Sequence, residues 1–254
     1  MSKHFAERIL TAIEDKQTPM VVGLDPDYTR IPKQIREIAA HSKSGLGERA
    51  SALSEFCQVI IDIVAPHVPA VKLQMAYFEL CGPAGLEAYH RVTDYAHEQG
   101  LVVIGDIKRA DIGSTSEALA AAYLDEAYIY EGTENERAVS VDAVTVNPYF
   151  GSDGVKPFIM KARENGQGVF VVVRSSNPSA REIQDIADAE GRMVYERLAS
   201  LCNDWANLPD CVGESGYSLV GAVVGATYPR EAELLRQVMP NSLFLVPGYG
   251  AQGA

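Results

Sequence analysis

The feature that most constrains the fold of this chain is a regular alternation of short apolar runs with longer amphipathic segments. Each run is rich in valine, isoleucine or leucine and is only a few residues long, as expected of a buried β-strand. Seven such runs lie at residues 20–25, 71–74, 101–108, 142–148, 168–174, 218–227 and 242–248. The alternation predicts an α/β protein with a parallel sheet, either an open doubly wound sheet or a (β/α)8 barrel.

Polar side chains at the ends of these runs favour the barrel. Most runs end on, or are followed by, groups that can bind or react: Asp25, Lys72, Asp106, Lys108, Asn147, Arg174, Ser175, Ser176 and Thr227. Functional groups drawn from many strand ends are typical of the mouth of a barrel, whereas an open sheet binds its ligand at one switch point. We therefore expect a (β/α)8 TIM barrel that forms a single domain over residues 1–254. Its eighth strand is expected beyond residue 254.

The third run, LVVIGDIKRADIGST at residues 101–115, ends on a cluster of charges. Alternate side chains of a strand share a face, so Asp106 and Lys108 should point the same way. Lys72 interrupts the second run, where a buried ammonium group needs partners. Asp106, Lys108 and Asp111 would surround it with alternating charge. The simpler interpretations are an exposed ion pair at a strand end and a Lys72 side chain that reaches the rim.

Composition excludes several classes of function. The net charge is −12 and no Lys/Arg-rich run is present, which argues against nucleic acid or an anionic membrane as a partner. No apolar stretch is long enough to span a membrane. The four cysteines form no C-x-x-C pair and no secretory signal precedes them, which predicts reduced thiols in the cytoplasm. No motif supports a zinc site or a serine hydrolase.

Two motifs have two interpretations each. GYGAQG at residues 248–253 matches a dinucleotide-binding pattern, but the helix, strand and acidic residue that this pattern requires do not follow it. It is either a phosphate-binding loop at a strand end or a plain turn. Asp25 in GLDPD either binds a ligand or belongs to an Asp-Pro turn.

Together, the motifs resemble the orotidine 5′-phosphate decarboxylase family, in its longer bacterial-type branch. The matching segments run from about residue 20 to the end of the chain: VVGLDPD, VKLQ, DIKRADIGST, VNPYFG and VPGYGAQG. The D-x-K-x-x-D signature is shared by a superfamily. Its combination with a lysine in the second strand and with the terminal P-G-x-G-A-Q-G is specific to this family.

The resemblance implies a carboxy-lyase that needs no metal or other cofactor. The expected reaction converts orotidine 5′-phosphate to uridine 5′-phosphate and CO2, the last step of de novo UMP biosynthesis. The family pattern implies a charged catalytic tetrad in which Lys108 delivers a proton to C6 of the pyrimidine. Its members are Lys72, Asp106, Lys108 and Asp111.

The resemblance also implies a set of substrate contacts and a homodimer with shared active sites. Asp25 and Lys72 would contact the ribose, Ser175 or Ser176 the pyrimidine, and Gln252 the phosphate. Asp111 and Thr115 would reach into the partner subunit's site. The full set of expected substrate-binding residues is Asp25, Ile112, Thr115, Asn147, Ser175, Ser176, Pro247 and Gln252.

The chain departs from the family pattern at one position. The family's phosphate-binding arginine follows the eighth strand, no residue here matches it, and Arg174 lies on a different strand. Two alternatives stay open. One is a Mg²⁺-dependent sugar-phosphate decarboxylase or aldolase of the same superfamily, which carries a glutamate where Lys72 lies, although Glu79 is close in sequence. The other is a catalytically inactive barrel that only binds a ligand.

Overall fold

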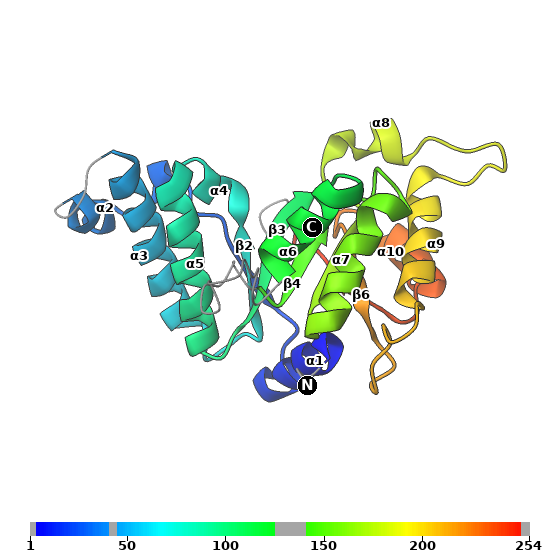
Figure 1. Cartoon of the computed structure of the whole chain (residues 1–254), viewed down its shortest axis with the longest axis horizontal. Coiled ribbons are helices and arrows are strands. Elements are labelled where there is room, and N and C mark those ends of the chain that lie inside the picture. The colour runs from blue at the N-terminus through cyan, green and yellow to red at the C-terminus, as the bar shows by residue number, and fades with distance from the viewer. Residues whose placement is uncertain (1–3, 41–44, 125–140, 250–254) are drawn as a thin grey trace.

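A computed structural model describes residues 4–40, 45–124 and 141–249 of the chain. Seven parallel strands form one sheet in which each strand pairs with its neighbours in sequence (Figure 1). They are β1 (Val21–Leu24), β2 (Ala70–Gln74), β3 (Val102–Arg109), β4 (Ala143–Val146), β5 (Gly168–Arg174), β6 (Ser218–Val224) and β7 (Ser242–Leu245). A doubly wound sheet would reverse its order at a switch point, so the unbroken order confirms the barrel architecture. The predicted eighth strand lies outside the described residues.

Helices connect the strands and cover the sheet, as Figure 1 shows. They are α1 (Phe5–Lys16), α2 (Lys33–Ala40), α3 (Leu46–Val64), α4 (Met75–Glu79), α5 (Gly82–Glu98), α6 (Gly113–Leu124), α7 (Ser152–Asn165), α8 (Arg181–Gln184), α9 (Val194–Ala206) and α10 (Pro229–Val238). Short 3-10 turns occupy Tyr28–Arg30 and Pro178–Ala180. Within the described part of the chain, no helix has the length and apolar character needed to cross a membrane.

Several strands end earlier than the sequence predicts. β4 stops at Val146 rather than at residue 148, and β7 stops at Leu245 rather than at residue 248. In both cases a proline follows within two residues, Pro148 and Pro247, and proline has no N–H to continue a ladder. β6 ends at residue 224 rather than 227, because the chain turns there against the loop that follows β5.

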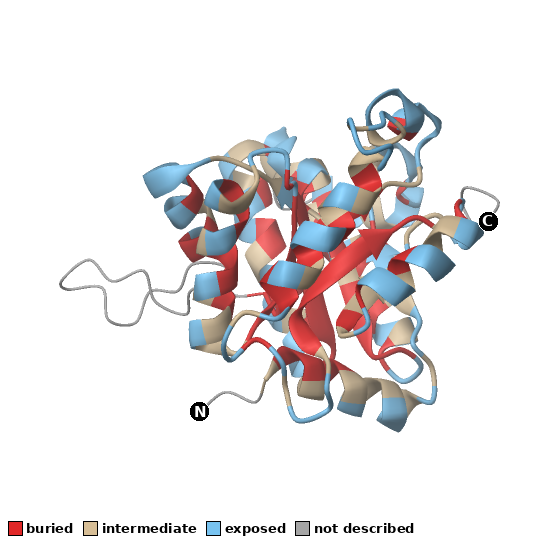
Figure 2. Cartoon of the chain, turned by 90° about the vertical axis from the view of Figure 1, so that its right-hand side faces the viewer, coloured by how far each residue is buried: buried red, intermediate tan, exposed pale blue. Residues whose placement is uncertain are grey.

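Helix α1 packs across the amino end of the sheet. Phe5 lies edge-on to Phe170 of β5, with ring centroids 5.8 Å apart. Gly168 makes this approach feasible, since a Cβ there would lie 2.4 Å from the Phe5 ring. Buried residues concentrate in the strands and on the helix faces that touch them (Figure 2). Helix α1 therefore covers the amino end of the sheet, and the carboxyl end is left for a site.

Candidate active site

The centre of the candidate active site is Asp106, a buried carboxylate of β3. Lys72 of β2 donates to Oδ2 with an Nζ–Oδ2 distance of 2.7 Å, and Lys108 donates to Oδ1 at 2.5 Å. The side chain of Asp106 is 5% exposed, that of Lys72 16% and that of Lys108 48%. The sequence-based expectation that the three charges face one another is therefore confirmed. The simpler interpretation of an exposed surface pair is wrong for Asp106.

The backbone at Lys108 has an unusual conformation. Its φ angle is 43°, in the left-handed region that few residues other than glycine adopt. The pairing of β3 with β4 shifts register between Gly105 and Arg109, which marks a bulge at this point. The Lys108 N–H donates to the Thr145 hydroxyl at 3.0 Å. This irregular end of β3 directs the lysine back over Asp106.

Two further side chains hold Asp106, and the sequence reasoning missed both. The Thr145 hydroxyl of β4 donates to Oδ1 at 2.9 Å, and the Gln74 amide of β2 donates to Oδ2 at 3.0 Å. Gln74 stands two residues after Lys72, so strand alternation could have placed it on the same face. Thr145 could not have been found in this way, because its contact depends on the pairing of β3 with β4. Each Asp106 oxygen accepts two hydrogen bonds.

The surroundings of Asp106 keep it ionised. Burial alone would raise the pKa of this carboxyl, but the charge of Lys72 and the hydrogen bonds from Lys108 and Lys72 outweigh it and lower the pKa below the ordinary value. The result is a fixed negative charge between two ammonium groups. Such a charge orients Lys108 before any substrate arrives.

The fourth member of the expected tetrad does not join the other three within one chain. The Asp111 carboxylate accepts the backbone N–H of Ile112 at 2.8 Å and, among the described residues, forms no ion pair with Lys72 or Lys108. Ile112 and Thr115 are exposed. Asp111, Ile112 and Thr115 thus lie on the segment between β3 and the first turn of α6, outside the Asp106 cluster.

Two expected substrate contacts lie at the ends of β1 and β4. Asp25 follows β1 directly and is exposed, and its carbonyl accepts the N–H of Asp27 at 2.9 Å. Asn147 follows β4 directly, is also exposed, and accepts the Tyr149 N–H at 3.1 Å through its side chain. Both turns place polar side chains at the same end of the sheet as Asp106.

The two serines after β5 differ in their hydrogen bonds. The Ser175 hydroxyl accepts from the Gln184 amide at 2.7 Å and donates to Asn177 at 2.8 Å. The Ser176 hydroxyl makes no hydrogen bond with the described residues, although its carbonyl accepts from Thr227 at 3.2 Å. Ser176 is therefore the serine whose hydroxyl is available to a ligand.

Arg174 and the chain end complete the set of expected positions. The guanidinium of Arg174 is 1% exposed and pairs with Asp185 at 2.6 Å, so it is not positioned to bind a phosphate at the mouth. The Pro247 carbonyl accepts the Ala226 N–H at 2.9 Å, next to the end of β6. Gln252 lies outside the described residues.

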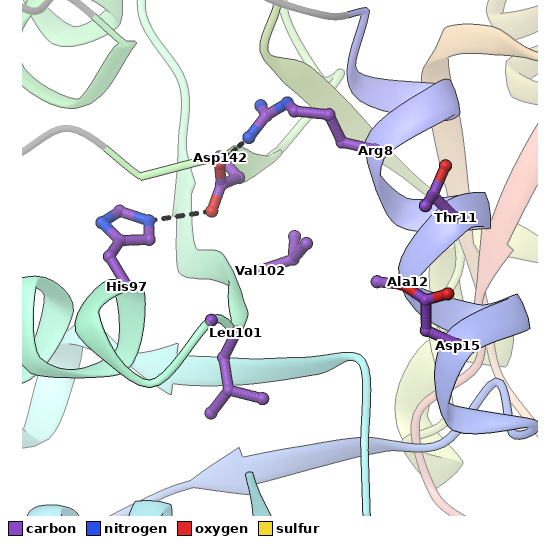
Figure 3. A pocket seen from close by; sticks show the side chains of 9 residues that line it. Arg8, Thr11, Ala12, Asp15, His97, Leu101, Val102 and Asp142 are labelled. Carbon is purple, nitrogen blue, oxygen red and sulfur yellow. Dashed lines mark hydrogen bonds and ion pairs between the residues drawn. The ribbon is translucent and has the colours of Figure 1, made fainter. Parts of the chain in front are cut away.

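A cavity of about 370 Å³ lies at the opposite, amino end of the strands (Figure 3). It borders Asp142, which precedes β4 and accepts from His97 at 2.9 Å, from the Val103 N–H at 2.7 Å, and from Arg8. Burial would raise the pKa of Asp142, but the hydrogen bond from His97 and the charge of Arg8 lower it. The sequence reasoning did not single out Asp142.

The described residues contain no group of three or more His, Cys, Asp or Glu side chains that could hold a metal ion. Glu79, which the Mg²⁺-dependent alternative would use, forms an ion pair with Arg109. Both oxygens of Asp106 already carry an ammonium group. The arrangement therefore presents two organic cations where a metal site of that alternative would need a free carboxylate.

Comparisons with known proteins place the chain in a family. Residues 18–254 match the model described as "Orotidine 5'-phosphate decarboxylase / HUMPS family". The chain is 38% identical to the orotidine 5′-phosphate decarboxylase of Caldicellulosiruptor bescii over 98% of its own length and 81% of that protein. It is 41% identical to the enzyme of that name from Rhodopirellula baltica, covering 98% of this chain and 79% of that one.

Solved structures agree with the sequence matches. The OMP decarboxylase of Leishmania donovani superposes with a TM-score of 0.73 at 27% identity, covering 96% of this chain and 80% of that one. The family match covers the signature segment with Asp106 and Lys108 and the second-strand Lys72. The chain belongs to the orotidine 5′-phosphate decarboxylase / HUMPS family.

Proposed function

We propose that this chain decarboxylates orotidine 5′-phosphate to uridine 5′-phosphate and CO2, the last step of de novo UMP biosynthesis. Relatives with 38% and 41% identity carry the name of that enzyme. The observation that carries the proposal is the buried Asp106 carboxylate with one ammonium group on each of its oxygens. This cluster lies at the carboxyl ends of the strands, where barrels collect their catalytic groups.

The chemistry requires a cation that is in place before the reaction. Loss of CO2 breaks the bond between C6 of the pyrimidine and its carboxylate, and leaves the electron pair on a ring carbon. A preorganised ammonium group stabilises this charge without a further rearrangement. Lys108 is that group, and it then donates a proton to C6 and regains one from solvent. Its side chain is 48% exposed, so both substrate and water can reach it.

Asp106 has two roles in this proposal. It fixes the Lys108 ammonium through a hydrogen bond of 2.5 Å, and its lowered pKa keeps it ionised at neutral pH. Lys72, 2.7 Å away, balances the charge of the carboxylate. Asp111 completes the tetrad from the partner subunit. No metal ion or other cofactor takes part.

The remaining groups bind the nucleotide. Asp25 and Lys72 contact the ribose. Ser176 contacts the pyrimidine, because the Ser175 hydroxyl already forms hydrogen bonds with Gln184 and Asn177. Asn147, Pro247 and Ile112 line the site, and Gln252 contacts the phosphate. Binding energy from the phosphate is used to align the reacting ring.

We infer a homodimer in which each subunit completes the site of the other. The segment that carries Asp111 and Thr115 is accompanied by exposed apolar side chains: Ile112 is 53% exposed, Tyr149 82% and Phe150 49%. Gly154 lies close to both the Asp111 carbonyl and the Phe150 side chain, so Phe150 and the Asp111 segment lie on the same part of the surface. Exposed apolar groups beside functional residues favour a protein partner at that surface.

We also infer that residues 1–254 act as one barrel domain and that the enzyme works in the cytoplasm. The support for one domain is the single sheet that all seven described strands share. The support for a reducing compartment is that all four cysteines are free.

The deciding experiment follows orotidine 5′-phosphate consumption by its ultraviolet absorbance, with and without excess EDTA. We expect turnover that EDTA does not reduce. Turnover that disappears with EDTA would favour the Mg²⁺-dependent alternative. A folded protein that shows a thermal shift with uridine 5′-phosphate but no turnover would be a binding barrel, and the proposed activity would be wrong.

A further inference from the structure

Arg174, the last residue of β5, is the largest fully buried side chain among the described residues. A guanidinium cannot lose its charge in a protein, so its burial requires compensating partners. Ser175 and Ser176 follow it directly in the sequence. The residue before the two serines is thus a buried cation, whereas the other residues of β5 are glycine, valine and phenylalanine.

The guanidinium of Arg174 joins segments that are far apart in the sequence. It stacks on the ring of Tyr228, 3.9 Å from the centroid, and lies 4.7 Å from the ring of Tyr195 at the start of α9. It donates to Asp185 at 2.6 Å and lies 3.9 Å from Glu231 in the first turn of α10. Because the fork of a guanidinium is planar and rigid, these contacts define its orientation.

The same guanidinium connects to the loop that carries the serines. The side-chain oxygen Oε1 of Gln184 accepts from Arg174 at 3.5 Å and from the Ser175 N–H at 3.1 Å, and the side-chain amide Nε2 of Gln184 donates to the Ser175 hydroxyl at 2.7 Å. Gln184 and Asp185 are adjacent at the end of α8. The contacts therefore close a ring from the end of β5, through α8, back to Ser175.

The backbone of Ser176, the next residue, contacts the segment that follows β6. Its backbone packs so closely on Gly225 that a Cβ there would lie 2.8 Å from the Ser176 Cα. The Ser176 carbonyl accepts from Thr227 at 3.2 Å. The Ser176 backbone is therefore held on both sides, while its hydroxyl makes no hydrogen bond with the described residues.

We propose that Arg174, through Asp185 and Gln184, is a positioning residue that aims the Ser176 hydroxyl at the pyrimidine base. A buried ion pair adds little stability over apolar residues of similar size. We therefore assign to the pair of Arg174 with Asp185 a role in orienting the loop that carries Ser176. This inference rests on the proposed function, because it takes the pyrimidine nucleotide as the ligand. It predicts that loosening Arg174 weakens recognition of the base and leaves recognition of the sugar phosphate unchanged.

The test measures binding of two ligands to the full chain: uridine 5′-phosphate, which carries the base, and ribose 5-phosphate, which lacks it. Asp185→Ala removes the closest anionic partner of Arg174. Glu231 and the rings of Tyr195 and Tyr228 still contact the guanidinium, so we expect the variant to fold. We expect its Kd for uridine 5′-phosphate to rise about tenfold, as for one lost hydrogen bond, and its Kd for ribose 5-phosphate to stay within about twofold. Arg174→Lys, which keeps the charge but loses the planar fork, should show the same selective loss.

Glu190→Ala is the matched control. Glu190 lies in the same segment and pairs with Arg192 at 3.3 Å, but it does not touch Arg174. We expect both affinities to stay at the parent values. Equal losses for both ligands in Asp185→Ala would mean that Arg174 only supports the fold, and the inference would be wrong.

A double-mutant cycle with Ser176→Ala tests whether Arg174 acts through the Ser176 hydroxyl. If Arg174 acts through Ser176, Asp185→Ala should weaken uridine 5′-phosphate binding by less than about twofold once the serine hydroxyl is gone. A full tenfold loss in that background would overturn the inference. If the parent binds uridine 5′-phosphate but does not consume orotidine 5′-phosphate, the proposed function fails while the cycle still decides the role of Arg174.

Discussion

The two ends of the sheet each hold a buried carboxylate with cationic partners, and the two differ in what those partners connect. Asp106, at the carboxyl end, accepts from Lys72 and Lys108, and the Lys108 side chain is 48% exposed. Asp142, at the amino end, accepts from Arg8 of α1, His97 of α5 and the N–H of Val103 in β3. Both carboxyl groups have a lowered pKa.

The comparison shows that burial and a shifted pKa do not by themselves identify a catalytic group. The partners of Asp142 link two helices and a strand, and Arg8 also donates to the Gly166 carbonyl after α7 at 3.2 Å. The partners of Asp106 come from β2, β3 and β4 and leave one ammonium group open to solvent. We therefore expect the amino-end cluster to control stability and the carboxyl-end cluster to control chemistry.

The largest expected effect comes from removing the open ammonium group. Lys108→Ala should reduce turnover of orotidine 5′-phosphate by at least about a thousandfold, because a preorganised cation at the reacting carbon is lost. The Kd for uridine 5′-phosphate should change little, since the product carries no charge at C6. Steady-state kinetics and calorimetry measure the two quantities.

The matched change at the amino end is Arg8→Ala. It should lower the free energy of unfolding, because the ion pair with Asp142 and the hydrogen bond to the Gly166 carbonyl are lost. Turnover should stay within about threefold of the parent, because Arg8 lies at the opposite end of the sheet from the Asp106 cluster. If Arg8→Ala reduced turnover as much as Lys108→Ala does, the division between the two ends would not hold.

The second prediction asks whether the carboxyl-end cluster is complete in one chain. Lys108→Ala and Asp111→Ala should each be nearly inactive alone. A mixed dimer of the two would contain one site with both residues intact and one site with neither, so isolated mixed dimers should recover about half of the parent turnover. Separate tags on the two variants allow the mixed species to be purified. Mixed dimers no more active than their parents would place Asp111 in its own subunit's site.

The third prediction compares equivalent substitutions at the two carboxylates. Asp142→Asn leaves Arg8 without its anion and should lower the free energy of unfolding by about 3 kcal/mol. Asp106→Asn leaves the Lys72 ammonium, whose side chain is 16% exposed, without its anion and should lower the free energy of unfolding by a comparable amount, although water still solvates Lys108. Urea unfolding measures both values. Turnover should distinguish the two variants, with the greater loss in Asp106→Asn.

The smallest expected effect is a pH dependence at the amino end. The pKa of Asp142 is lowered in the folded chain, so its contribution to stability is complete above its unfolded pKa of about 3.9 and is lost as the pH falls through the folded value. The difference in unfolding free energy between the parent and Asp142→Asn should therefore shrink between pH 5 and pH 3. A difference that grows over this range would mean that the carboxylate does not stabilise the fold.

Local periodicity determined much of the architecture. Apolar runs of strand length separated by helical segments predicted all seven described strands, and strand alternation predicted that Asp106 and Lys108 share a face. The position of Lys72 inside an apolar run indicated a buried partner, and Asp106 is that partner. These inferences succeeded because each depends on residues within one strand or on neighbouring strands of a simple parallel order.

Other features were decided only by the tertiary structure, because they depend on register and on which helix covers which strand. The contact of Thr145 with Asp106 arises from the pairing of β3 with β4 at a bulge. The engagement of Ser175, but not Ser176, depends on α8 lying over the end of β5. The Asp142 cluster needs α1 to cross the amino end of the sheet. Such contacts join residues up to 134 positions apart, a separation over which no local pattern carries information.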